Sequence, residues 1–113
     1  MEDHSINKLT DLIVAIIKRP AMYQVSNVED IYLIVFGYSW AIPSIEPDIF
    51  DTFLQGFKNF VNEYFAEDFS SKKDYDWSRL IRFYSAGDSH SIELFGKLFE
   101  QFTATFKDEY KLE

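Results

Sequence analysis

The stretch that decides the fold is DIFDTFLQGFKNFVNEYF, residues 48–65. Its large apolar side chains recur at intervals of three and four residues, which places them along one side of an α-helix. These residues are Phe50, Phe53, Leu54, Phe57, Phe60, Val61 and Tyr64. The sequence therefore predicts a helix from Asp48 to about Phe65, with one side packed against a core.

The chain before this stretch begins with a similar pattern. Ser5 is a residue type that caps helix N-termini, and Pro20 cannot continue a helix beyond about Lys18. The residues between them are spaced for one buried side: Ile6, Leu9, Leu12, Ile13, Ile16 and Ile17. We expect a first helix over Ser5–Lys18, followed by a connector over residues 21–26.

A second helix is expected after Asn27, which is another capping type. Glu29 and Asp30 then lie in the first turn, where carboxylates favour the helix dipole. The apolar period continues to Pro43 through Ile31, Ile34, Val35, Tyr38, Ala41 and Ile42. The β-branched and aromatic run Ile31–Phe36 is also compatible with a buried strand. Gly37 weakens a helix and would permit close approach of another one.

Two more helices are expected after residue 65. Residues 43–47 and 67–75 are polar or proline-containing and predict loops. Asp76 can cap a helix over Trp77–Tyr84, and Asp88 or Ser89 can cap a fifth. The inward residues would be Trp77, Leu80, Ile81 and Tyr84, then Ile92, Phe95, Leu98, Phe99, Phe102, Phe106 and Tyr110. The 113 residues therefore predict an all-α fold, a compact single-domain bundle of about five helices over residues 1–113.

Composition limits the compartment and the chemistry. Cysteine is absent, so disulfides, thiolate nucleophiles and Cys-ligated metals are excluded. The N-terminus is acidic and polar, unlike a signal peptide, and the longest uncharged apolar stretch is too interrupted to span a bilayer. We expect a cytoplasmic protein that does not bind a membrane.

The charge is concentrated in the middle of the chain. The formal net charge is −8, and residues 27–71 hold eight acids against a single base, which gives −7 for this segment. Such a field repels nucleic acid and attracts basic proteins. The predicted acidic face comprises Glu29, Asp30, Glu46, Asp48, Asp51, Glu63, Glu67 and Asp68. For each acid alone, a solvated surface or helix-dipole role is the simpler interpretation.

Aromatic residues exceed what a small core needs, with 12 Phe, 7 Tyr and 2 Trp. Most should be buried, but tyrosine and tryptophan are also enriched at protein interfaces. The residues predicted to contact a partner are Tyr32, Tyr38, Trp40, Tyr64 and Tyr75.

Catalytic patterns are sparse. Asp88-Ser-His-Ser91 holds the residue types of a hydrolase triad, but neighbours in sequence diverge at a helix start, so capping is the better explanation. His90 and Glu93 lie one turn apart, yet a helical di-metal site needs a second such pair and two more carboxylates. No phosphate-binding loop is present. We expect no catalytic residue, no cofactor and no metal.

Several features together resemble small bacterial immunity proteins of contact-dependent growth inhibition and related polymorphic toxin systems. They are the segment Ile16–Tyr23 with its Pro-x-Met-Tyr, the pair Gly37-Tyr38, Phe57 with Phe60, Trp77, and the Phe-rich segment Phe95–Phe106. The resemblance implies a cytoplasmic antitoxin that neutralises one cognate toxin domain, commonly a nuclease, by tight binding. It transfers no site residue, and Arg19, Pro20, Met22 and Tyr23 are expected to form a structural corner.

The leading hypothesis is therefore a non-enzymatic inhibitor whose acidic surface captures a basic nuclease toxin, with a ribonuclease as one candidate. A DNA mimic or another regulatory inhibitor is the first alternative, and it would bind several basic nucleic-acid-binding proteins. A small helical ligand-binding protein is the second alternative, and it would need an enclosed aromatic cavity.

Overall fold

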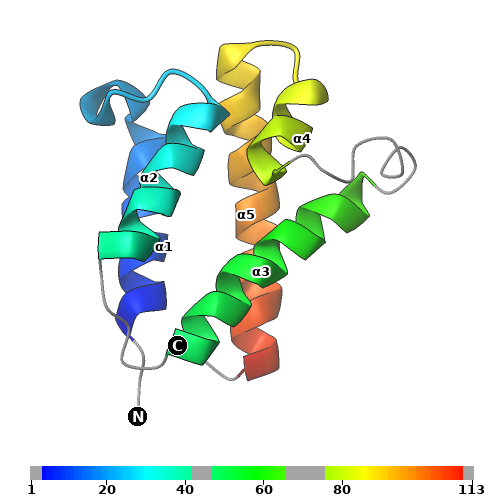
Figure 1. Ribbon diagram of the computed structural model, residues 1–113. Helices are drawn as coiled ribbons and strands as arrows, with labels where there is room; N and C mark the ends of the chain where they lie inside the picture. The colour runs from blue at the N-terminus through cyan, green and yellow to red at the C-terminus, as the bar shows by residue number, and fades with distance from the viewer. Residues whose placement is uncertain (1–3, 42–46, 66–75, 111–113) are drawn as a thin grey trace.

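The computed structural model describes residues 4–41, 47–65 and 76–110, and these residues contain helices and no strand. The elements, shown in Figure 1, are α1 (His4–Lys18), the short 3₁₀ helix η1 (Pro20–Tyr23), α2 (Val28–Ala41), α3 (Pro47–Tyr64), α4 (Trp77–Phe83) and α5 (Asp88–Tyr110). The predicted all-α bundle of five helices is confirmed. The segment Ile31–Phe36 is helical, so its interpretation as a strand is wrong.

Two of the predicted caps are present. The Asn27 side-chain oxygen accepts a hydrogen bond from the Asp30 N–H at 3.1 Å, and the Asp76 carboxylate accepts one from the Arg79 N–H at 3.0 Å. Each bond satisfies one of the donors that a helix start leaves without an intrahelical partner. These caps fix the first turns of α2 and α4.

Other boundaries differ from the prediction by about one residue. α1 begins at His4, so Ser5 lies inside its first turn, and Pro47 opens α3, as the fixed φ of proline allows. α5 begins at Asp88, and the Gly87 carbonyl accepts the first helical hydrogen bond, from the Ser91 N–H at 2.9 Å. Neither Asp88 nor Ser89 is therefore the cap.

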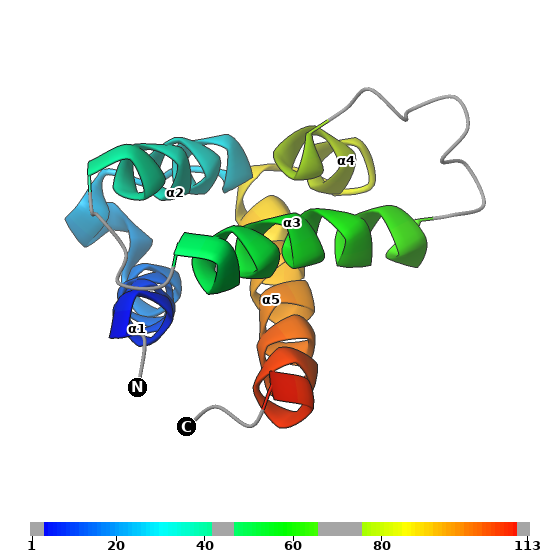
Figure 2. The ribbon, with the colours of Figure 1, turned by 60° about the horizontal axis from the view of Figure 1, so that its bottom comes forward.

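α5 organises the core, because it packs against each of the other four α-helices. Figure 2 shows α2 and α4 at the top, α1 and most of α5 below them, and α3 crossing in front of α5. The centre is a cluster of aromatic rings in which Phe57 lies 5.1 Å from Trp77 and 5.7 Å from Phe95, measured between ring centroids. The buried apolar residues are Ile6, Leu9, Ile13, Ile16, Val25, Val28, Ile31, Val35, Phe53, Phe57, Val61, Trp77, Leu80, Ile81, Ile92, Phe95, Leu98, Phe99, Phe102 and Phe106.

Three expectations about packing need correction. Tyr64 is exposed, because it lies at the end of α3, and Ala41 is exposed at the end of α2. Nothing lies within 4 Å of a Cβ placed on Gly37, so no helix of the described chain uses it for close approach. Gly56 has that role instead, since its Cβ would lie 3.1 Å from the ring of Phe102 on α5.

Candidate functional site

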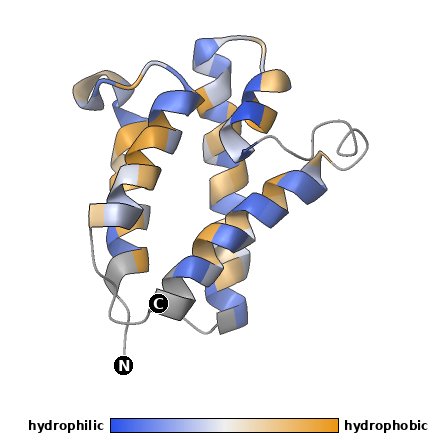
Figure 3. Ribbon diagram, viewed as in Figure 1, coloured by the Kyte–Doolittle hydropathy of each residue, from blue (hydrophilic) through white to orange (hydrophobic). Residues whose placement is uncertain are grey.

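α2 differs from the other helices because it is apolar around most of its circumference. Figure 3 shows α3 with alternating polar and apolar bands, whereas the middle turns of α2 are largely apolar. One side of α2 is buried in the core through Val28, Ile31 and Val35. An all-round apolar helix is normally enclosed by protein, yet the opposite side of α2 faces outward.

The outward side of α2 exposes three large apolar residues. Leu33 is 63% exposed, Phe36 is 52% exposed and Trp40 is 79% exposed. They follow one another at intervals of three and four residues, so they form one stripe along the helix. Single exposed apolar residues are ordinary, but a contiguous stripe marks a contact surface.

A line of aromatic rings, which we call the aromatic ladder, connects this stripe with the core. Trp77 of α4 lies edge-on to Tyr32 at 5.2 Å between centroids, Tyr32 stacks on Phe36 at 6.3 Å, and Phe36 lies 6.2 Å from Trp40. These spacings lie in the favourable range for aromatic pairs. The ladder therefore starts at the buried Trp77, and exposure to solvent increases from Tyr32 to Phe36 and then to Trp40.

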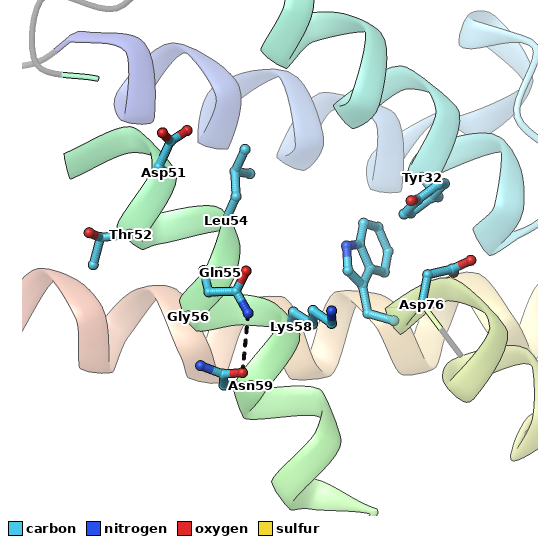
Figure 4. Close-up of a pocket in the computed structure, with 10 residues that line it drawn as sticks. Tyr32, Asp51, Thr52, Leu54, Gln55, Gly56, Lys58, Asn59 and Asp76 are labelled. Atoms are coloured by element: carbon cyan, nitrogen blue, oxygen red, sulfur yellow. Dashed lines mark hydrogen bonds between the residues drawn. The ribbon is translucent and has the colours of Figure 1, made fainter. Parts of the chain in front are cut away.

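A groove of about 780 Å³ lies beside the ladder, with α3 along one side and Tyr32 of α2 and the start of α4 on the other, and we call it the α2–α3 groove. No Cα atom of the described part of α2 comes within 8 Å of a Cα atom of α3, so the two helices are splayed rather than packed. Figure 4 shows the groove with Tyr32 and Asp76 at one end and Asp51 at the other. The lining residues are Tyr32, Asp51, Thr52, Leu54, Gln55, Gly56, Lys58, Asn59, Asp76 and Trp77.

The groove carries two acids and one base, namely Asp51, Asp76 and Lys58. One oxygen of Asp76 is engaged at the start of α4, where it also accepts from the Ser78 hydroxyl. Burial, and secondarily the charge of Asp76, raise the pKa of the Tyr32 phenol. Gln55 donates to Asn59 at 3.4 Å on the α3 side, so this side is largely polar, whereas Tyr32 of α2 and Trp77 of α4 contribute aromatic rings.

The described acids of the predicted acidic face occupy three separate settings. Glu29 accepts from the Arg82 guanidinium at 3.1 Å, and Asp30 accepts from the Ser26 N–H at 2.8 Å, so both have structural partners. Asp51 lines the α2–α3 groove, whereas Glu63 lines a different hollow between α3 and α5. Glu46, Glu67 and Asp68 lie outside the described residues, as does the side chain of Asp48.

The predicted aromatic contacts are also dispersed. Tyr32 and Trp40 belong to the aromatic ladder, whereas Tyr38 is half-buried against the core. Tyr64 is exposed at the far end of α3, where its ring lies edge-on to Phe65 at 4.9 Å. Tyr75 lies outside the described residues.

The triad-like segment Asp88–Ser91 is occupied by structural contacts. The His90 Nδ1 accepts from the Ala86 N–H at 2.7 Å, and the Ser91 hydroxyl donates to the Asp88 carbonyl at 2.6 Å. The Asp88 carboxylate pairs with Arg82. In the described part of the chain, no three potential metal ligands lie together.

Sequence reasoning missed Leu33, Phe36 and the groove itself. It considered only tyrosine and tryptophan as contacts, although the all-round apolar character of residues 31–36 indicated that the outward side of this helix would also be apolar. The groove has no local signal, because it arises from the angle between α2 and α3.

No protein-family model matches this chain, and no significant match was found among the curated proteins or the solved structures. None of the described helices combines the length and apolarity needed to cross a membrane.

Proposed function

We propose that this protein acts by binding a basic protein toxin and blocking it, as an immunity protein of a polymorphic toxin system does. The observation that supports this most is the exposed side of α2, where Leu33, Phe36 and Trp40 form an apolar stripe beside an open groove. Stripes of this kind act in protein recognition because burying them on a partner releases water from apolar surface. The resemblance in the sequence supplies the biological setting, which would be the cytoplasm.

The net charge supports a basic partner. At −8, the protein attracts cationic surfaces over a distance set by ionic strength, about 8 Å at physiological salt. Nuclease clefts are basic because they bind phosphates, so an acidic inhibitor reaches them quickly. The proposal therefore expects association that slows as salt rises, with dissociation set by the apolar contacts.

The alternatives receive less support from the same observations. The Phe-lined interior contains a cavity of only about 10 Å³, too small for a ligand, so an enclosed aromatic binding site is not present there. A mimic of nucleic acid needs a regular array of carboxylates, whereas Glu29 and Asp30 are engaged with Arg82 and Ser26.

The test is neutralisation of the toxin domain encoded directly upstream of this gene. Co-expression of that domain with this protein should restore growth, and the two should copurify as a stable complex. The variant Trp40→Ala should weaken protection, whereas Met22→Ala, which alters a residue that is 70% exposed on η1, should not. Full toxicity in the presence of abundant folded protein would contradict the proposal.

A further inference from the structure

We propose that the α2–α3 groove receives a positively charged amphipathic helix of the partner. This inference rests on the proposed function, since it takes the partner to be a protein, and it adds which part of the partner docks. Helix-in-groove recognition uses one apolar side of the incoming helix, anchored at intervals of three and four residues.

The shape fits a helix because α3 forms one side of the groove, while Tyr32 of α2 and the start of α4 form the other. Packed helices lie about 8–10 Å apart, and the described residues of α2 and α3 do not approach to direct packing. A third helix between them would contact both. Gly37 lies on the exposed side of α2 with nothing within 4 Å of its added Cβ, so a backbone can approach α2 closely there.

The chemistry of the walls selects an amphipathic occupant. Tyr32 and Leu54 offer apolar surface in the groove for leucine-like side chains, and the rings of Phe36 and Trp40 continue this surface from Tyr32 along α2. Asp51 provides a carboxylate on the α3 side. Aromatic faces beside carboxylates also favour lysine and arginine, because a cation is attracted by both.

Charge decides between a foreign partner and a second copy of this chain. A second copy would bring a further net charge of −8 to the interface. Like charges at an interface oppose association. A cationic partner removes this repulsion, so the groove fits a basic helix better than it fits α2 of another molecule.

The experiment uses the full-length protein and a synthetic Leu/Lys peptide of about four helical turns, ~14 residues, with its leucines on one side. Binding is followed by the emission of Trp40, which is exposed while Trp77 is buried, and by amide chemical shifts in NMR spectra. A Leu/Glu peptide with the same pattern tests charge. A Leu/Lys peptide of the same composition without an apolar side tests amphipathicity.

Paired variants locate the site. The double variant Phe36→Ala/Trp40→Ala, followed by NMR shifts, should weaken binding of the Leu/Lys peptide about tenfold or more. Asp51→Lys should weaken it several-fold, whereas Lys58→Glu should strengthen it. Asp11→Lys makes the same charge change on the exposed surface of α1 and should have a clearly smaller effect than Asp51→Lys.

Several results would overturn the inference. One is that the Leu/Glu peptide or the non-amphipathic peptide binds as tightly as the amphipathic Leu/Lys peptide. Another is that the NMR chemical-shift changes map away from α2 and α3, or that Asp51→Lys and Asp11→Lys weaken binding equally. Self-association of the protein through α2 would also contradict it. The two proposals fail separately. If the toxin is neutralised equally well by the Phe36→Ala/Trp40→Ala variant, the groove assignment is wrong while the function stands. If the Leu/Lys peptide binds the groove but the toxin stays active, the proposed function is wrong while the groove assignment stands.

Discussion

Ser91 joins two helices that are far apart in the sequence, and its removal is the sharpest test of the packing. Its hydroxyl accepts a hydrogen bond from the Val28 N–H at 3.0 Å, across 63 residues, and donates to the Asp88 carbonyl at 2.6 Å. Both Ser91 and Val28 are fully buried. The Val28 N–H opens α2, where a helix supplies no partner of its own.

Ser91→Ala leaves that N–H buried without an acceptor. An unsatisfied buried donor costs about 1–3 kcal/mol, which for a domain of this size lowers the midpoint of thermal unfolding by roughly 4–12 °C. Urea unfolding followed by circular dichroism measures the loss in free energy. The Val28 amide should also exchange with solvent faster, because its hydrogen bond is gone.

Ser89→Ala is the matched control, since it changes the same residue type in the same turn at an exposed position. It should alter the free energy of unfolding by less than about 0.5 kcal/mol. Equal stabilities of the two variants, or unchanged exchange at Val28, would refute the assignment of this bond.

Three further comparisons test the core and the surface. Gly37→Ala should stabilise the protein by about 0.5–1 kcal/mol, whereas Gly56→Ala should fail to do so, because its methyl group would lie 3.1 Å from a ring carbon. Urea titration checks both, and an equal gain at the two sites would contradict the packing. Phe57→Ala should cost about 3–5 kcal/mol, far more than Phe83→Ala at a residue that is 55% exposed, as measured by chemical denaturation. The fold raises the pKa of the Tyr32 phenol, chiefly through burial. In the unfolded chain this phenol loses its proton at a pH near its ordinary pKa of about 10, which is below its pKa in the folded protein. The folded state therefore loses stability as the pH rises from the unfolded pKa through the folded pKa. Tyr32→Phe should therefore lose less stability than the wild type from about pH 9 to pH 11, and parallel losses would count against this account.

The sequence predicted most of the helical content because its signals are local. Capping residues such as Asn27 and Asp76 act within one helical turn. The spacing of three and four residues around Phe53 and Phe57 likewise predicts which side of α3 is buried. Boundaries were predicted less accurately, since the residue at the cap position of α5 is Gly87 and not Asp88 or Ser89.

The candidate site was harder to predict because it depends on tertiary arrangement. A run of acids in sequence need not form one surface, and here Glu29 turns to Arg82 while Asp51 lines the groove. Trp40 is exposed, as a contact residue must be, and its contact with a partner stays a prediction, whereas the exposure of Phe36 and Leu33 was not expected. Their exposure follows from the angle at which α2 lies on α4 and α5, which no local pattern encodes.

The central claim is that this protein captures its target through α2 and α3. Hydrogen–deuterium exchange of the protein with and without the purified upstream toxin domain tests it most directly. The account predicts slowed exchange on complex formation in residues 30–41 and 51–59, with α1 unchanged. Slowed exchange confined to α1 and the outer side of α5, or no complex with a folded and active toxin domain, would contradict it.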